Sequence, residues 1–290
     1  MFLQQLINGL TLGSVYALVG VGYSLVYGVL GLINFAHGSI YTWGAFFAFT
    51  LLAYTGTPFP LAFLLAMGAT ALVGAIVERM AYYPLRKSPL MSQIVAVLGI
   101  SIIMDNLAML IWGSEAQAFP SVMGSQVWTF AGVRISLLQF LIMGAGIVLM
   151  VALYFLVYQT KVGAAMRATS LDADAASLMG INVERLRLMT FTLSAALAAA
   201  AGTLIGAYYR TVIFNMGYGV VIKAFVVAIL GGMGNVVGAM LGGLLMGLIE
   251  CFGAAYIASG YKDAFVYIVL FLVLLLRPNG LLGTYEKEKV

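Results

Sequence analysis

The stretch "KVGAAMRATSLDADAASLMGINVERLRL" (161–188) gathers charge in a chain that otherwise has little. The protein has 14 basic and 10 acidic side chains, and the first of them along the chain is Glu78. Seven of these 24 lie in this one stretch: Lys161, Arg167, Asp172, Asp174, Glu184, Arg185 and Arg187. Long apolar runs flank the stretch on both sides, so we interpret it as a charged connection between membrane segments.

Composition places the rest of the chain in a bilayer. The sequence is 63% hydrophobic and 8% charged, whereas soluble domains carry about 25% charged residues. The runs 1–77, 135–160, 188–209 and 224–249 contain no charge, and about 20 apolar residues suffice for a spanning helix. The strands of a membrane barrel would alternate apolar and polar residues, and these runs do not. The 34 glycines suit close packing between membrane helices.

We therefore expect an all-α, polytopic transmembrane helical bundle formed by one domain, 1–290. Several of its segments are short or interrupted by glycine, which predicts eight or nine membrane segments with broken or re-entrant helices. The expected segments are 5–29, 38–55, 60–82, 91–112, 136–158, 187–207, 218–230, 237–257 and 263–277.

The connections predict the orientation in the membrane. Basic residues gather in 79–90, in 161–187 and in the tail after 276, whereas the loops 54–60 and 113–135 offer only Arg134. Cytoplasmic loops carry the excess of Lys and Arg, so we expect the N-terminus outside and the C-terminus in the cytoplasm. The net charge of +4 reflects this topology, and we expect membrane lipid as a partner but no nucleic acid.

The sequence carries no signature of catalysis or of a resident cofactor. It has one cysteine, which is too few for a cysteine-based metal site, and one histidine, which cannot form a metal site alone. It contains no Gly-Lys pair, so the phosphate-binding loop that holds ATP is missing. We expect no metal, no bound cofactor and no enzymatic activity in this chain.

Two stretches interrupt the apolar pattern, "GLINFAHGS" (31–39) and "LGGMGNVVGAMLGG" (230–243). Corresponding breaks in two halves are typical of discontinuous helices near a transport path. The residues expected to line such a path are Asn34, Phe35, His37, Gly38, Gly231, Gly232, Gly234 and Asn235. The alternative is a pair of tight turns, with a structural His37 and with Gly238/Gly242 and Gly243/Gly247 as helix-packing pairs.

Three charges stand inside the expected membrane segments: Asp105, Lys223 and Glu250. Charge in lipid is costly, so it pairs or faces a watery cavity. The topology puts all three in the outer half of the membrane. We expect Lys223 to pair with Asp105 or Glu250, and contact with substrate is the alternative.

Within the opening stretch, "TSLDADAASLMG" (169–180) predicts a helix of about ten residues, roughly 15 Å long and too short to span a bilayer. Thr169 and Asp172 match the start of a helix, and Gly180 suits its end. Leu171, Ala175, Leu178 and Met179 recur at helical spacing and form an apolar stripe. We expect Asn182 to cap the next helix. The stripe requires something to bury against, and its small side chains favour a cytoplasmic protein partner over the membrane surface.

This loop resembles the coupling loop of ABC importer permeases, in which an alanine-rich helix meets the ATPase. The residues that the resemblance assigns to coupling are Arg167, Leu171, Asp172, Asp174, Ala175, Ala176, Leu178, Met179 and Gly180. The usual Glu-Ala-Ala of that loop is replaced here by Asp174-Ala175-Ala176. The segments 6–38, 228–250 and 261–283 resemble the LivH type of branched-chain amino acid permease, with "NFAHG" and "LGGMGN" as the specific motifs.

The resemblance implies a permease of the bacterial inner membrane that works with several partners. These are two ATP-binding subunits, which hold ATP and Mg, a homologous second permease and a periplasmic or extracellular substrate-binding protein. The cargo would be leucine, isoleucine and valine or similar small polar solutes. The rival function is a self-sufficient secondary transporter or channel with Asp105 or Glu250 as its ion site, but such a protein has no need of a cytoplasmic docking helix.

Overall fold

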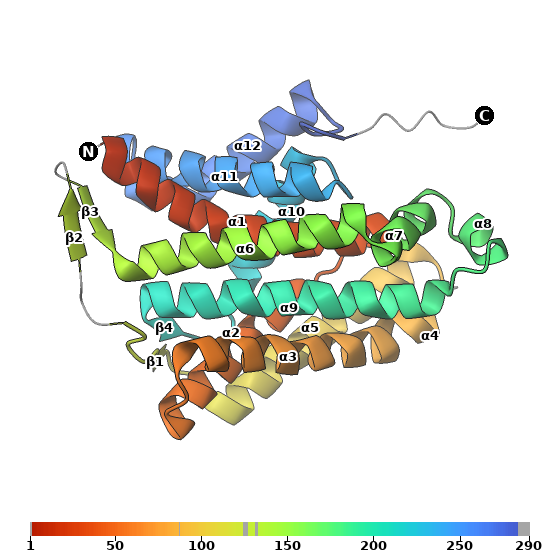
Figure 1. Ribbon diagram of the computed structural model, residues 1–290, viewed down its shortest axis with the longest axis horizontal. Coiled ribbons are helices and arrows are strands. Elements are labelled where there is room, and N and C mark those ends of the chain that lie inside the picture. The colour runs from red at the N-terminus through yellow and green to blue at the C-terminus, as the bar shows by residue number, and fades with distance from the viewer. Residues whose placement is uncertain (1, 87, 124–126, 131–132, 284–290) are drawn as a thin grey trace.

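The computed structural model describes residues 2–86, 88–123, 127–130 and 133–283. It is a bundle in which α1, α3, α6, α9 and α11 run roughly alongside one another (Figure 1). The long helices are α1 (Phe2–Leu30), α2 (His37–Thr55), α3 (Phe59–Val77), α5 (Leu90–Trp112), α6 (Leu137–Gln159), α9 (Val183–Tyr209), α10 (Gly217–Gly231), α11 (Val236–Tyr256) and α12 (Lys262–Leu276). The predicted helical bundle is confirmed.

Each of the nine expected membrane segments is a helix, but they are not equivalent. Within the described part of the chain, seven helices are long and apolar enough to cross a membrane. The two that are not among these seven are α10, with 15 residues, and α2, with 19. The first turns of α2 are polar and buried: His37, Ser39 and Thr42 are each no more than 2% exposed. These two helices adjoin the predicted breaks in the sequence.

Two small pairs of strands, which the sequence did not predict, lie at one end of the bundle. The strand β1 (Gln117–Ala118) pairs antiparallel with β4 (Thr211–Val212), and β2 (Val127–Phe130) pairs with β3 (Val133–Ser136). Figure 1 places them at the end where α1 begins, while α4 (Tyr83–Leu85), α7 (Lys161–Leu171) and α8 (Ala173–Leu178) lie at the opposite end. The basic connections therefore gather at the end opposite to the strands; Lys87, Lys287 and Lys289 lie outside the described residues.

Helix α1 is the centre of the bundle and is buried along most of its length. It crosses α11 through glycines that bring the two backbones together. A Cβ atom added to Gly247 would lie 2.3 Å from the Cα atom of Gly13, and one added to Gly243 would lie 2.3 Å from the Cα atom of Ala17. Only small residues permit such an approach, so the packing role that the alternative interpretation gave to Gly243 and Gly247 is confirmed.

The helix that begins with α3 changes its winding before it ends. Residues Glu78–Tyr82 form a π-helical turn between α3 and α4. Such turns are rare inside α-helices and are frequent at functional sites. The turn rotates the following residues relative to α3. It carries a buried glutamate, Glu78, which is a further charge inside an expected membrane segment besides Asp105, Lys223 and Glu250.

Candidate functional site

The predicted coupling helix is present as two helices and not as one. Asp172 is extended, with φ −160° and ψ 108°, and separates α7 from α8. Its Oδ1 accepts hydrogen bonds from the backbone N–H groups of Asp174 and Ala175 at 3.0 and 2.9 Å. The predicted start at Thr169 is wrong, because Thr169 is buried inside α7 while Asp172 satisfies the free N–H groups of α8.

The far end of α8 follows the prediction. Gly180 adopts the left-handed conformation with φ +86°, which glycine tolerates without strain. Its N–H group donates to the carbonyl of Ser177, and the N–H group of Ile181 donates to the carbonyl of Ala176. Asn182 accepts a hydrogen bond from the N–H group of Arg185 at 3.0 Å and so caps α9. Local hydrogen bonds therefore fix both ends of a helix of only six residues.

The loop presents its large apolar side chains to the outside. Leu171, Leu178 and Met179 are 84, 88 and 84% exposed, and Ala175 is exposed as well. Because the helix breaks at Asp172, these residues do not form a continuous stripe on one helix, as the spacing had predicted. They form a tip around α8, of which Ala176, 5% exposed, is the buried inner side.

The base of the loop is anchored to the bundle. Met166 of α7 packs in a small core with Val29 of α1 and Leu186 of α9. The guanidinium of Arg167 donates to the carbonyl of Val157 in α6 and lies over the ring of Tyr158. Arg167, which the resemblance assigned to coupling, therefore lies against its own chain. Helix α7 connects the exposed tip to α1, α6 and α9.

The first break contacts α1, α9, α10 and the π-helical turn. His37 is fully buried, and its ring nitrogens lie 3.1 Å from the carbonyl oxygen of Val19 and 3.4 Å from Oγ of Ser194. Asn34 is 1% exposed and accepts a hydrogen bond from the Tyr82 hydroxyl at 3.1 Å. At Gly38 an added Cβ atom would lie 2.4 Å from the carbonyl oxygen of Gly217 in α10. Phe35, the remaining residue proposed for this break, is half-buried.

The second break is held by the segment that follows α12. The N–H groups of Leu281 and Leu282 donate to the carbonyls of Leu230 and Gly231, and the Asn235 amide donates to the carbonyl of Leu282. Gly232 and Gly234 have φ values of +103° and +83°. Both breaks contact α1, the first at Val19 and the second through a hydrogen bond from Gly234 to Ser24 at 3.0 Å. A role for these residues in a transport path stays a prediction.

Lys223 is paired as expected with Glu250, but Asp105 is not its partner. The ammonium of Lys223 lies 3.0 Å from both carboxylate oxygens of Glu250 and 3.3 Å from Asp263 at the start of α12. The Tyr16 hydroxyl of α1 donates to Glu250 at 2.7 Å. Asp105 lies on α5 beside Ser39 of α2 and forms no ion pair with any described residue. Sequence reasoning missed Asp263, which only the fold of α12 against α10 brings into place.

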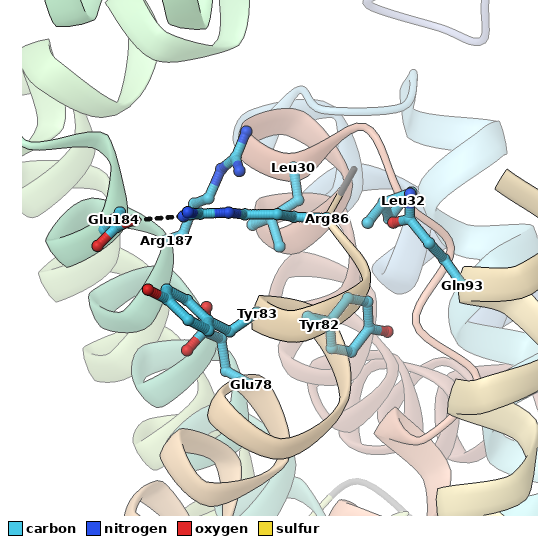
Figure 2. Close-up of a pocket in the computed structure, with 9 residues that line it drawn as sticks. All are labelled: Leu30, Leu32, Glu78, Tyr82, Tyr83, Arg86, Gln93, Glu184 and Arg187. Carbon is cyan, nitrogen blue, oxygen red and sulfur yellow. Dashed lines mark hydrogen bonds and ion pairs between the residues drawn. The ribbon is translucent and has the colours of Figure 1, made fainter. Parts of the chain in front are cut away.

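A cavity of about 100 Å³ opens at the end of the bundle where α4 lies. Glu78 of the π-helical turn and Arg187 of α9 line it together with Arg86, whose guanidinium pairs with Glu184. This hydrogen bond raises the pKa of Arg86 above its ordinary value. Figure 2 shows the charged side chains toward α9, and Leu32 and Gln93 across from them. The complete lining is Leu30, Leu32, Glu78, Tyr82, Tyr83, Arg86, Gln93, Glu184 and Arg187.

Comparisons with known proteins agree with the fold. A permease protein of Pseudomonas aeruginosa, BraD of a high-affinity branched-chain amino acid transport system, is 42% identical over 100% of this chain and 98% of its own length. LivH of Escherichia coli K12, from a system of the same description, is 39% identical over the same shares. LivM of that organism is 28% identical over 94% of this chain and 68% of its own length.

Solved structures show the same fold at low identity. A metal-chelate type ABC transporter in an inward-facing conformation aligns with a TM-score of 0.54 and 18% identity, over 95% of this chain and 87% of that one. The family model described as "Branched-chain amino acid transport system / permease component" matches residues 5–274. The chain, with its several membrane-spanning helices and its exposed loop between α6 and α9, therefore belongs to the permease components of branched-chain amino acid transport systems.

Proposed function

We propose that this chain is the membrane permease subunit of an ATP-driven importer that carries leucine, isoleucine and valine. It works with a homologous second permease of the LivM kind, two ATP-binding subunits and a substrate-binding protein at the end where the strands lie. The strand end faces outside, so the N-terminus is outside and α4, α7 and α8 face the cytoplasm. This orientation is supported by the excess of basic residues at the end where α4, α7 and α8 lie.

The exposed tip around α8 carries the argument for the ATPase contact. Leu178 and Met179 are more than 80% exposed on a surface outside the membrane segments. Such exposed apolar side chains are typical of a docking site. The chain supplies caps at both ends of α8 but leaves these side chains uncovered. A groove on an ATP-binding subunit would bury them, and each buried leucine contributes roughly 1.5–3 kcal/mol.

The anchored base gives this contact a route into the bundle. Movement of α8 would be passed through Met166 to Val29 near the end of α1. The same half of α1 contacts both breaks, at Val19 and at Ser24. ATP and Mg are bound by the partner subunits in this proposal, since this chain has no phosphate-binding loop. In this proposal the permease couples a displacement of α8 to a rearrangement of the residues around the two breaks.

Uptake of labelled solutes tests the function. Cells that lack this chain should take up less leucine than the parent at low external concentration, with urea uptake unchanged, and the restored gene should reverse the loss. ATP depletion should abolish the leucine uptake. Uptake that survives ATP depletion but collapses with a protonophore would contradict the proposal and support an ion-gradient transporter.

A further inference from the structure

We propose that the cavity at the α4 end of the bundle is a binding site for a small zwitterionic α-amino acid with an aliphatic side chain. The chemistry of the lining carries the proposal, while the identification of the ligand with the transported cargo rests on the proposed function. The cavity, lined by α4, α5 and the start of α9 (Figure 2), opens at the end of the bundle where we expect the cargo to be released.

Glu78 supplies the negative side of the site. It is 4% exposed and lines the cavity, yet no described residue forms a hydrogen bond or ion pair with its carboxylate. Arg79, Arg187 and Arg86 act on this carboxylate only at a distance, and none of them forms a direct ion pair with it. A charge that is taken out of water is stabilised by a direct partner. The π-helical turn fixes the position of Glu78 in the cavity wall. An ammonium group from a ligand would satisfy it.

The positive side comes from Arg187 of α9. The Nε atom of Arg187 is buried and has no hydrogen-bond partner among the described residues. Arg187 forms no ion pair within 4 Å with the part of the chain that the structure describes, while Arg86 is held by Glu184. The planar guanidinium of arginine suits a carboxylate. The cavity thus presents a cation and an anion in the same wall, and neither has a direct ion-pair partner among the described residues. This arrangement matches the two charges of a zwitterion.

The opposite wall distinguishes an amino acid from an inorganic ion. Leu30 and Leu32 contribute apolar surface, which suits an aliphatic side chain. The amide oxygen of Gln93 is buried without a partner, while its nitrogen donates to the carbonyl of Ser88 at 2.8 Å. This oxygen is a second acceptor for an ammonium group. A volume of about 100 Å³ lies below the roughly 300–1,000 Å³ of pockets for drug-sized ligands, so the site is limited to a small ligand such as a single amino acid.

Direct binding to the purified permease complex, without the substrate-binding protein, tests the site. The probes are L-leucine, 4-methylpentanoate, which lacks the ammonium, and 3-methylbutylamine, which lacks the carboxylate. We expect both analogues to bind at least tenfold more weakly than leucine. Glu78→Gln should weaken leucine at least tenfold but leave 4-methylpentanoate unchanged. Arg187→Gln should weaken leucine and 4-methylpentanoate but leave 3-methylbutylamine unchanged.

Two further variants keep the outcome decisive. Leu32→Trp should block leucine by filling the cavity without altering a charge, and this holds even if Glu78→Gln fails to fold. Glu115→Gln removes an exposed carboxylate outside the cavity and should bind leucine like the wild type. The inference is overturned if leucine does not bind, or if it binds equally to the wild type and to the Leu32→Trp variant.

The same set separates this site from the proposed function. Leucine uptake by cells together with absent leucine binding to the complex would leave the function standing and remove the site. If the analogues and variants bind as expected but cells take up no leucine, the site stands and the proposed function is removed. Preferential binding of glycerophosphoethanolamine over leucine would reassign the cavity to a lipid headgroup and overturn the proposal.

Discussion

The crossing of α1 with α11 and the tip around α8 differ in how much of their surface the chain itself buries. At the crossing, glycines bring two backbones together, and the buried side chains of Tyr16 and Glu250 contact Lys223 of α10. At the tip, the backbone is fixed by Asp172 and Gly180, but Leu178 is 88% exposed. The crossing is buried within this chain, whereas the large apolar side chains of the tip are exposed.

This contrast predicts where the chain can be altered without loss of the fold. Changes at the crossing should reduce the amount of folded permease, because no partner has to be present for the damage to appear. Changes at the tip should leave folding intact and remove a function that requires a second protein.

The largest effect is expected from Lys223→Met. It leaves Glu250, 3% exposed, with the Tyr16 hydroxyl as its remaining partner, and removal of one member of a buried ion pair costs about 3–5 kcal/mol. We expect a low yield of folded protein and a lower unfolding temperature in detergent. Glu250→Gln in the same chain should restore part of both. Asp105→Asn should restore neither, since Asp105 lies outside the cluster. Full yield of Lys223→Met with selective loss of uptake would instead assign Lys223 to transport.

A smaller but still severe loss is expected from Gly247→Val at the crossing. The new Cβ atom would lie 2.3 Å from the Cα atom of Gly13, a backbone position that cannot move without shifting α1. Overpacking of this kind costs about 1–3 kcal/mol and occasionally more. Size-exclusion chromatography and thermal unfolding in detergent measure the loss. Gly144→Val in α6 is the matched control, because an added Cβ atom there meets nothing within 4 Å. Equal stability of the two variants would contradict the close crossing.

Asp172→Ala should lower the stability of α8 by about 1 kcal/mol, the usual contribution of a helix N-cap. The variant loses the two hydrogen bonds that hold the N-terminus of α8, so hydrogen exchange should quicken in α8 while α7 and α9 stay protected. Asp172→Asn, which still accepts these bonds, should retain most of the protection. Unchanged exchange in the alanine variant would mean that the cap does not fix the tip.

Sequence patterns predicted the bundle well because the length of an apolar run and the charged residues at its ends are local properties of the sequence. All nine expected segments are helices, with ends near those predicted. The division of the loop at Asp172 was missed because Thr169 and Asp172 both resemble helix starts. Their competition is decided by tertiary burial of Thr169 inside α7, which no local pattern reveals.

Pairings across the bundle were predictable only in part. Depth in the membrane suggested Glu250 and Asp105 equally as partners of Lys223, since it gives no information on rotation about the helix axes. The position of Asp263 depends on how α12 packs on α10 and α11. Glu78 was overlooked because it stands beside Arg79 near a segment end. The π-helical turn, a local change of winding, is what directs it into a cavity.

The smallest effect on folding, and the largest on transport, is expected from Leu178→Asp. The side chain is 88% exposed and contacts little of its own chain, so insertion and unfolding temperature should match the wild type. A docked ATPase would lose the roughly 1.5–3 kcal/mol of a buried leucine and would face a stranded charge. We expect the ATP-binding subunits to be lost on purification, or to hydrolyse ATP without leucine uptake. Ala175→Trp should act alike by overfilling the groove, while Leu178→Met should behave as the wild type. If both disruptive variants keep their ATPase and their uptake, the tip is an ordinary surface, and the contrast between the two regions does not extend to assembly.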